Sequence, residues 1–169
     1  PLGEGEVVVS SLLVKDFKKD INVIISTANG MIKRTSLSDF KITRTSKPSS
    51  CIKLKDGDTV VDVMLDTNPN IFIATSLGYG LWFAKDEVPI VGIKASGVKA
   101  INLKDDTVVS TINFNEEVSD YLAILTDKGT GKRVKLKDFE KSSRARRGLM
   151  TIRDVKTNPY HVIKALILT

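Results

Sequence analysis

Residues 21–37, INVIISTANGMIKRTSL, decide the fold, because they join two apolar strands through a tight turn. β-branched and other apolar side chains dominate residues 21–27, which favours a buried strand. Asn29-Gly30 is a strong hairpin signal, since both central residues of a type I′ turn need positive φ. We therefore predict an antiparallel hairpin with a type I′ turn at Asn29-Gly30, followed by a second strand from Met31 to Leu37.

The same layout returns twice further along the chain. Gly30 corresponds to Gly78 and Gly129, at intervals of 48 and 51 residues, and a threonine lies three residues before each glycine. An apolar residue, expected to fill the core of its unit, lies ten positions after each glycine, at Phe40, Val88 and Phe139. Three units of about fifty residues indicate a modular array.

The strands inside each unit are short, and no window has helical periodicity. A period near fifty with about four strands per unit fits the blades of a propeller better than a sandwich. We therefore expect an all-β, propeller-like array of about three four-stranded blades, forming one repeat domain over residues 1–169. The blade units are expected at about 21–65, 71–114 and 120–168. Residues 6–14 resemble the closing strand of a preceding unit, which predicts a fragment of a longer array.

Composition excludes several classes of function. The chain has 169 residues, 41% of them hydrophobic, and its single cysteine, Cys51, forms neither an internal disulfide nor a zinc site by itself. No apolar run approaches the roughly 20 residues of a membrane span. Gly129-Thr130-Gly131-Lys132 lacks the first glycine of a phosphate loop, and His161 has no partner implied by spacing. We therefore expect no catalytic residues, no metal, no cofactor and no membrane contact.

Positive charge recurs at one place in every unit. The net charge is +6 from Gly30 to Lys55, +2 from Gly78 to Lys104 and +7 from Gly129 to Arg153, in a chain of net charge +6. A basic stripe repeated in this way is typical of a protein that holds nucleic-acid phosphates. The candidate DNA-binding residues are Lys33, Arg34, Arg44, Lys47, Lys94, Lys99, Lys132, Arg133, Arg144, Arg146, Arg147 and Arg153.

The repeat pattern carries a family resemblance. The pattern combines Thr-x-x-Gly, a basic or aromatic pair, Asp/Glu with Phe/Val, a basic segment and Leu-Lys-Asp. This combination resembles the β-pinwheel repeat in the C-terminal domain of bacterial gyrase and topoisomerase IV A subunits. The resemblance covers about residues 7–168. It implies a disc of blades, each with strands contributed by the next, whose basic edge binds and bends duplex DNA without reading its sequence.

The resemblance also implies the surroundings of the chain. Besides duplex DNA, the partners would be the ATPase B subunit, together with the remainder of the topoisomerase A subunit, in a cytoplasmic, nucleoid-associated enzyme. Strand cleavage and ATP hydrolysis belong to other parts of that ATP-dependent enzyme, so this chain is expected to bind without turnover.

The gyrase branch carries a box of glutamine, arginine and glycine residues that supports tight DNA wrapping. The nearest match here, Ser143-Arg144-Ala145-Arg146-Arg147-Gly148-Leu149, has no glutamine and only one glycine. This departure favours topoisomerase IV (ParC) over gyrase (GyrA), whose wrapping domain stays the alternative.

Other interpretations stay open at this point. A propeller that serves as a platform for protein partners would also show repeated blades, and an acidic partner would select a basic edge. A propeller enzyme would need polar residues converging on a central channel, which the pattern does not show. Trp82 replaces Arg34 and Arg133 at the same repeat position, where packing between blades is expected. Asp39, Glu87 and Asp138 recur singly, which favours a role in turns over a metal site.

Overall fold

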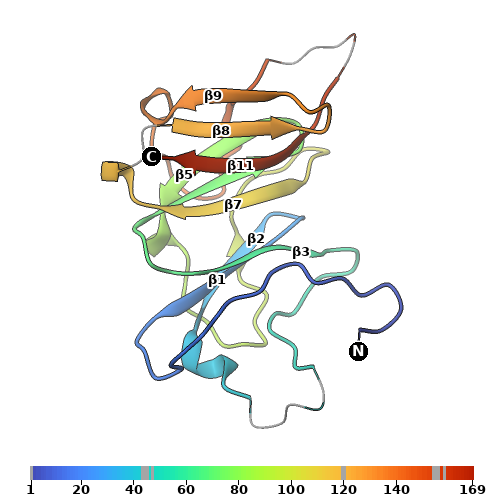
Figure 1. Cartoon of the computed structure of the whole chain (residues 1–169), viewed down its shortest axis with the longest axis vertical. Helices are drawn as coiled ribbons and strands as arrows, with labels where there is room; N and C mark the ends of the chain where they lie inside the picture. Colours follow the sequence, from blue (N-terminus) through green and yellow to red (C-terminus); the bar gives the residue numbers. More distant parts are fainter. Residues whose placement is uncertain (1, 43–45, 47, 119–120, 154–156, 158) are drawn as a thin grey trace.

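The computed structural model describes the whole chain except residues 1, 43–45, 47, 119–120, 154–156 and 158. Three antiparallel sheets follow one another along the longest axis of the molecule (Figure 1). The first sheet has the order β3 (Val60–Leu65), β1 (Asn22–Thr27), β2 (Met31–Ser36) and β6 (Val98–Lys99). The second has β10 (Leu149–Met150), β5 (Tyr79–Ala84), β4 (Asn70–Thr75) and β7 (Val108–Phe114). The third has β11 (Val162–Leu168), β8 (Tyr121–Thr126) and β9 (Gly131–Lys135).

Helix is confined to short 3-10 turns in the part of the chain that the structure describes. These are η1 (Leu37–Phe40), η2 (Lys85–Glu87), η3 (Glu116–Val118) and η4 (Leu136–Asp138). The expected all-β architecture is confirmed. Asp39, Glu87 and Asp138 each lie in one of these turns, as their recurrence suggested.

The outer strand of a sheet comes from the following unit. β6 belongs to the second repeat but pairs with β2 of the first, with Met31 opposite Lys99. In the same way β10, from the third repeat, pairs with β5, with Leu149 opposite Gly80. Each complete sheet therefore links two repeats through backbone hydrogen bonds.

A glycine without space for a side chain precedes each of these exchanged strands. Gly97 has φ +83°, and a Cβ added there would lie 2.3 Å from the Ile32 carbonyl oxygen. Gly148 has φ +85°, and its Cβ would lie 2.3 Å from the carbonyl oxygen of Gly80. Because only glycine adopts this backbone conformation readily and lacks a Cβ, these two residues let the incoming strand approach its neighbour.

The hairpin turn differs from the predicted type. Of Asn29 and Gly30, only Gly30 has a positive φ, and the loop between β1 and β2 has three residues. The Gly30 N–H donates to the Thr27 carbonyl at 3.0 Å, while the Met31 N–H donates to the Thr27 hydroxyl at 3.1 Å. The threonine side chain thus replaces the second hydrogen bond of a two-residue turn, and a glycine with positive φ closes a three-residue hairpin. The same threonine and glycine contacts recur at Thr75 and Thr126.

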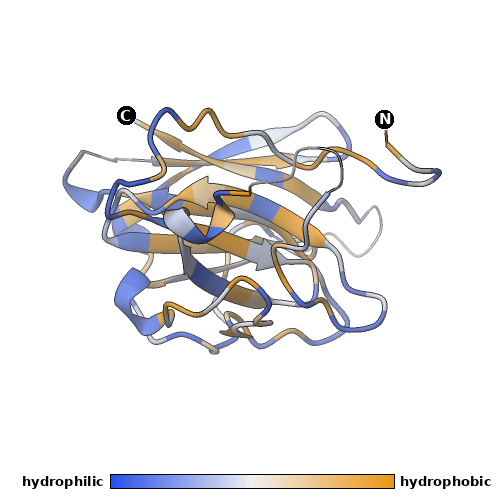
Figure 2. Ribbon diagram, turned by 90° about the horizontal axis from the view of Figure 1, so that it is seen from below, coloured by the Kyte–Doolittle hydropathy of each residue, from blue (hydrophilic) through white to orange (hydrophobic). Residues whose placement is uncertain are grey.

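Packing between the sheets forms a core on both faces of β4. Ile71 and Ile73 lie in a cluster with side chains of the first sheet, while Phe72 lies in a cluster with side chains of the third. Alternate residues of a strand point to opposite faces, so a strand buried on both sides has a continuous apolar run. Figure 2 shows the hydrophobic segments along the strands and hydrophilic segments in many of the loops. Trp82 also lies in the cluster between the second and third sheets, which confirms its expected packing role.

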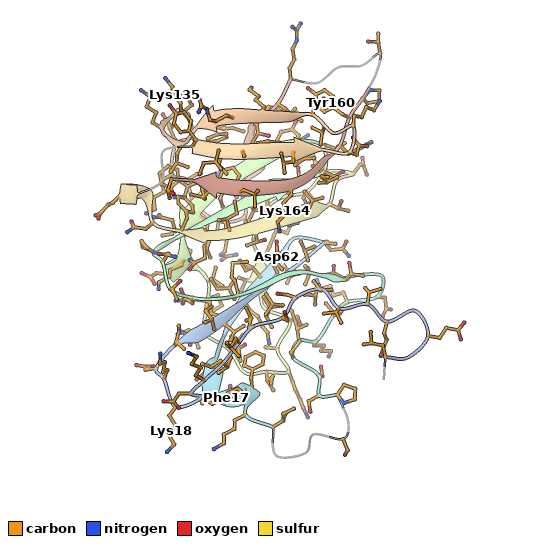
Figure 3. All side chains as sticks on the ribbon, in the orientation of Figure 1. Phe17, Lys18, Asp62, Lys135, Tyr160 and Lys164 are labelled. Atoms are coloured by element: carbon orange, nitrogen blue, oxygen red, sulfur yellow. The ribbon has the colours of Figure 1, made fainter. Side chains whose placement is uncertain are left out.

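The closing strands β3, β7 and β11 contact one another through polar side chains. Asp62 on β3 accepts a hydrogen bond from the Thr111 N–H of β7 at 2.8 Å, and its other oxygen lies 3.4 Å from the Lys164 ammonium of β11. Figure 3 shows Asp62 and Lys164 close together near the middle of the molecule. The sheet edges carrying β6 and β10 therefore lie away from this central contact.

Residues 6–14 form no strand, contrary to the expectation. Ser10 donates a side-chain hydrogen bond of 3.3 Å to the Val63 carbonyl, but Val7 and Leu13 are largely exposed. A β-branched sequence forms a strand only where its backbone groups find partners.

We predict that Gly148→Ala lowers the free energy of unfolding by about 3 kcal/mol, because a left-handed backbone and a steric overlap act together. Gly57→Ala is the control, since Gly57 also has φ +75° but open space around it, and it should lose only about 1 kcal/mol. Urea unfolding of both variants measures the difference. Equal losses would show that the close approach to Gly80 adds nothing to the cost.

Candidate nucleic-acid interface

The two basic residues on β2 are buried. Lys33 is 0% exposed, and its ammonium donates hydrogen bonds to the carbonyls of Gly92 at 3.2 Å and Ile93 at 2.9 Å. Burial lowers the pKa of Lys33 from its ordinary value, while nearby Cys51 and Asp39 act in the opposite sense. The expectation that this residue presents charge at the surface is wrong, since its ammonium instead holds the loop from the second unit.

Arg34 is also internal, at 8% exposure. Its guanidinium donates to the Val88 carbonyl at 2.8 Å and to the Asp66 carboxylate at 3.1 Å. Asp66 in turn lies 2.9 Å from the Lys85 ammonium. This network joins β2 to η2 across the junction of the first two repeats. The prediction that Arg34 lies on an exposed edge is therefore wrong.

The remaining candidates lie at or near the surface, where the structure describes them. Arg44 and Lys47 fall outside the described residues. Arg144 and Arg147 are half-buried. The exposed candidates are Lys94, Lys99, Lys132, Arg133, Arg146 and Arg153.

Two basic segments occupy equivalent places before the exchanged strands. Residues 92–96 precede β6, and residues 143–147, here called the basic segment of the third unit, precede β10. Because β6 and β10 are outer strands, these segments lie at the sheet edges remote from β3 and β7. Lys94 and the three arginines of the third unit's basic segment thus lie at the outer edges, whereas Lys33 and Arg34 do not.

The three arginines of the third unit's basic segment have different surroundings. Arg144 is anchored, because its backbone N–H donates to the Glu87 carboxylate at 2.8 Å and its guanidinium donates to the carbonyls of Glu87 and Lys99. Arg146 is exposed and donates to the Ser143 hydroxyl at 3.2 Å. Arg147 packs on an aromatic ring, so the cluster combines one structural arginine with two that reach solvent.

Arginine stacks on tyrosine at two places. The Arg147 guanidinium carbon lies 4.3 Å from the centre of the Tyr79 ring, and the Arg133 carbon lies 4.4 Å from that of Tyr121. Such cation–π contacts restrict the side chain and leave most of its N–H donors free. Lys132, beside Arg133, donates to the Thr151 carbonyl at 3.2 Å.

Sequence reasoning missed the lysines of the Leu-Lys-Asp repeat. Lys55 and Lys104 served as markers of the repeat and as the ends of the segments whose net charge was counted, and they were not named as candidates. Both side chains are exposed. Their recurrence at the same repeat position was the signal that would have identified them. Exposed lysines also occur at Lys41, Lys53, Lys135, Lys137 and Lys141.

Two further kinds of feature, metal-binding groups and membrane-spanning helices, are not found in the described part of the chain. No three His, Cys, Asp or Glu side chains there are grouped so as to hold a metal ion. No described helix has the length and apolar character needed to cross a membrane. His161 donates its backbone N–H to the Asp127 carboxylate at 2.9 Å, and this bond lowers the pKa of Asp127 from its ordinary value.

The repeated hairpins, the exchanged outer strands and the basic edges define a propeller-like repeat domain. The chain belongs to the family described as "DNA gyrase C-terminal domain, beta-propeller", which matches residues 22–65, 69–115 and 120–169. The resemblance expected from the repeat pattern is confirmed.

Related proteins of this family are topoisomerase subunits. The chain is 42% identical over 163 residues to the A subunit of DNA topoisomerase 4 from Bacillus subtilis, covering 96% of this chain and 20% of that protein. It is 36% identical over 170 residues to the corresponding protein of Staphylococcus epidermidis, covering 99% and 21%. The chain thus spans about a fifth of the length of these relatives.

Solved structures agree with this assignment. The C-terminal domain of DNA topoisomerase IV matches with a TM-score of 0.95 and 37% identity, over 100% of this chain and 53% of that one. The DNA gyrase A C-terminal domain matches with a TM-score of 0.85 and 24% identity, over 99% and 56%, which shows the shared fold. The expected preference for topoisomerase IV over gyrase is confirmed.

We predict that Arg34→Ala lowers the free energy of unfolding by about 3 kcal/mol, because the buried Asp66 carboxylate loses a charge partner. Arg133→Ala removes the equivalent residue of the third unit, which is exposed, and should cost no more than about 1 kcal/mol. Thermal and urea unfolding compare the two. Similar small losses would contradict the structural role of Arg34.

Proposed function

We propose that this chain binds and bends duplex DNA as part of the A subunit of a bacterial type II topoisomerase, of the topoisomerase IV kind. The observation that carries the proposal is the placement of the basic segments at the outer sheet edges. Lys94 and Lys99 at the first edge and Arg146 and Arg147 at the second lie on or beside the exchanged strands. A duplex running past successive edges would meet positive charge at each blade.

Contacts of this kind hold DNA without reading its sequence. Lysine and arginine bind phosphate oxygens, which are the same at every base pair, so they set position and orientation rather than sequence preference. Because the edges belong to stacked sheets and not to a flat surface, DNA that contacts several of them would have to curve. Curvature is the property by which the module would present a DNA segment to the rest of the enzyme.

The wider assembly follows from the family and is part of the proposal. The remaining four fifths of the subunit would carry strand cleavage, and the ATPase B subunit would supply the energy of ATP hydrolysis. This chain would contribute segment selection during relaxation, decatenation or supercoiling, in the cytoplasm and in association with the nucleoid. It would hold no cofactor of its own.

We predict that duplex affinity falls linearly on a log–log plot against salt, by a slope of about 0.9 for each phosphate neutralised. Fluorescence anisotropy with two duplexes of unrelated sequence and equal length measures the slope and the sequence preference. DNA ring closure, with and without protein, measures bending. Absence of binding at low salt would overturn the proposal, as would strong preference for one sequence. An acidic polypeptide that displaces DNA at equal charge would favour a platform for protein partners instead.

A further inference from the structure

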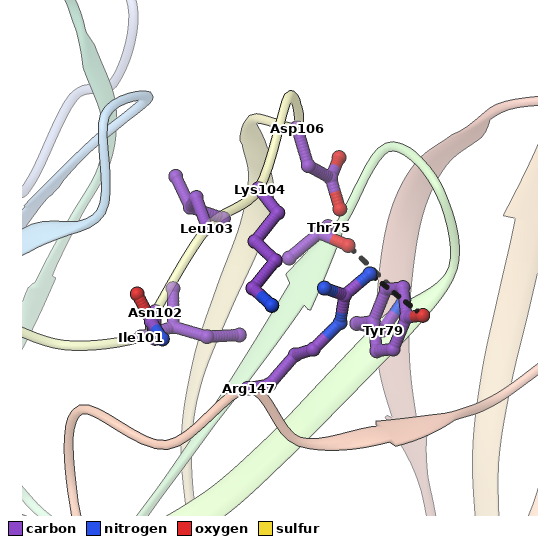
Figure 4. A pocket seen from close by; sticks show the side chains of 8 residues that line it. All are labelled: Thr75, Tyr79, Ile101, Asn102, Leu103, Lys104, Asp106 and Arg147. Carbon is purple, nitrogen blue, oxygen red and sulfur yellow. Dashed lines mark hydrogen bonds between the residues drawn. The ribbon is translucent and has the colours of Figure 1, made fainter.

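A narrow crevice in the second blade brings together residues of two repeats (Figure 4). Thr75 and Tyr79 flank the hairpin between β4 and β5, and Asn102, Lys104 and Asp106 come from the segment before β7. Arg147 comes from the third unit's basic segment. In Figure 4 the Lys104 ammonium and the Arg147 guanidinium point toward the same space.

We propose that Lys104 and Arg147 together bind one phosphate group of duplex DNA, and that Tyr79 is the positioning residue that holds Arg147 for this contact. The inference rests on the proposed function and deepens it. It assigns a specific role to one blade, where the general proposal requires only positive charge along the edge.

Tyr79 holds the Arg147 guanidinium in two ways. The ring lies beneath it at 4.3 Å, and the phenol oxygen accepts a hydrogen bond from Nη2 at 2.8 Å. Tyr79 itself is fixed, because its backbone N–H donates to the Thr75 hydroxyl at 3.0 Å and the side chain is half-buried. An arginine held in this way has lost rotamer freedom before DNA arrives, so less entropy is lost on binding. The guanidinium has five N–H donors, and its remaining ones are available to a planar pair of phosphate oxygens.

The backbone beneath Arg147 is fixed as well. Ala145 has φ +64°, and its N–H donates to the Ala100 carbonyl at 2.8 Å. The Arg146 carbonyl accepts the Asn102 N–H at 2.9 Å, and Gly148 is packed against Gly80. These contacts join the arginine to the segment that carries Lys104, so the spacing of the two cations is set by backbone hydrogen bonds.

The charge of the crevice favours an anion. Among the residues that the structure describes, Lys104 has no hydrogen-bond or ion-pair partner, and it is exposed. Asp106 lines the same crevice, but one of its oxygens already accepts the backbone N–H groups of Leu77 at 3.0 Å and Thr107 at 2.8 Å. The two cations outnumber this single carboxylate, whose charge those donors partly balance.

The first blade supplies a natural comparison. At the equivalent positions it keeps the lysine as Lys55, but Met31 stands in place of Tyr79 and Ser96 in place of Arg147. Lys55 is exposed like Lys104, so replacing either lysine by alanine removes one exposed charge. Any difference in duplex affinity between the two variants therefore reflects the surroundings of the lysine in the crevice and not the number of charges removed.

The experiment measures duplex binding by anisotropy over a salt series, with thermal unfolding of every variant. We expect Lys104→Ala and Arg147→Ala each to weaken binding by about tenfold, as for loss of a charge-assisted hydrogen bond, and to lower the salt slope by about one. Lys55→Ala should weaken binding by less than about threefold. Arg147→Lys keeps the charge but loses the fork and the stacking, so the slope should be kept while affinity falls severalfold.

Tyr79→Leu tests the positioning role. It should weaken binding by about threefold in the wild-type background and leave binding unchanged in the Arg147→Ala background, while Tyr79→Phe, which keeps the ring, should give an intermediate loss. Equal losses for Lys55→Ala and Lys104→Ala would overturn the crevice as a site. Full affinity in Arg147→Lys, or the same loss from Tyr79→Leu in both backgrounds, would overturn the role of Tyr79. Wild-type protein that fails to bind duplex DNA at low salt would refute the proposed function itself, which separates the two failures.

Discussion

The contact of a glycine with the backbone of the preceding repeat is the constraint on which the architecture depends. Gly97 lies against the Ile32 carbonyl and Gly148 against that of Gly80, and each leads directly into an exchanged strand. A side chain at either position would push the exchanged strand away from its partner and break the hydrogen bonds that link the repeats. The same contact fixes the basic segments at the outer edges, because those segments end at these glycines. Fold and proposed DNA contact thus share one geometric requirement.

Basic residues serve two physical purposes in this molecule. Inside the junction of the first two repeats, Lys33 donates hydrogen bonds to backbone carbonyls and Arg34 forms an ion pair with Asp66. Lys104 is exposed and Arg147 is half-buried in the same crevice, where we propose that they bind a phosphate group. The net charge of a repeat therefore overstates the charge at its surface. Surface charge depends on which cations the following repeat covers.

The sequence predicted the positions of the repeats, the all-β class and the family. These predictions succeeded because the spacing of threonine and glycine depends on the local geometry of the turn that recurs in each repeat. It gave the wrong turn type, since the contribution of the Thr27 hydroxyl to the turn is not part of the Asn-Gly signal. It also placed Lys33 and Arg34 at the surface. Their burial depends on residues 88–93, more than fifty positions away, and a local pattern does not contain that contact. The recurrence of Lys104 would have marked it as a candidate, but its closeness to Arg147 depends on the exchanged strand, which a local pattern does not contain.

Strand exchange also sets a delay during protein synthesis. β1, β2 and β3 have all been made once Leu65 is added, whereas β6, which covers the open side of β2, begins only at Val98. At about 5–20 residues per second, the ribosome needs roughly two to seven seconds to supply it. During that interval the nascent first sheet has an unpaired edge, which is a template for wrong strand pairing. The linear distance between a hairpin and its borrowed strand therefore determines how long the edge of the nascent sheet stays unpaired.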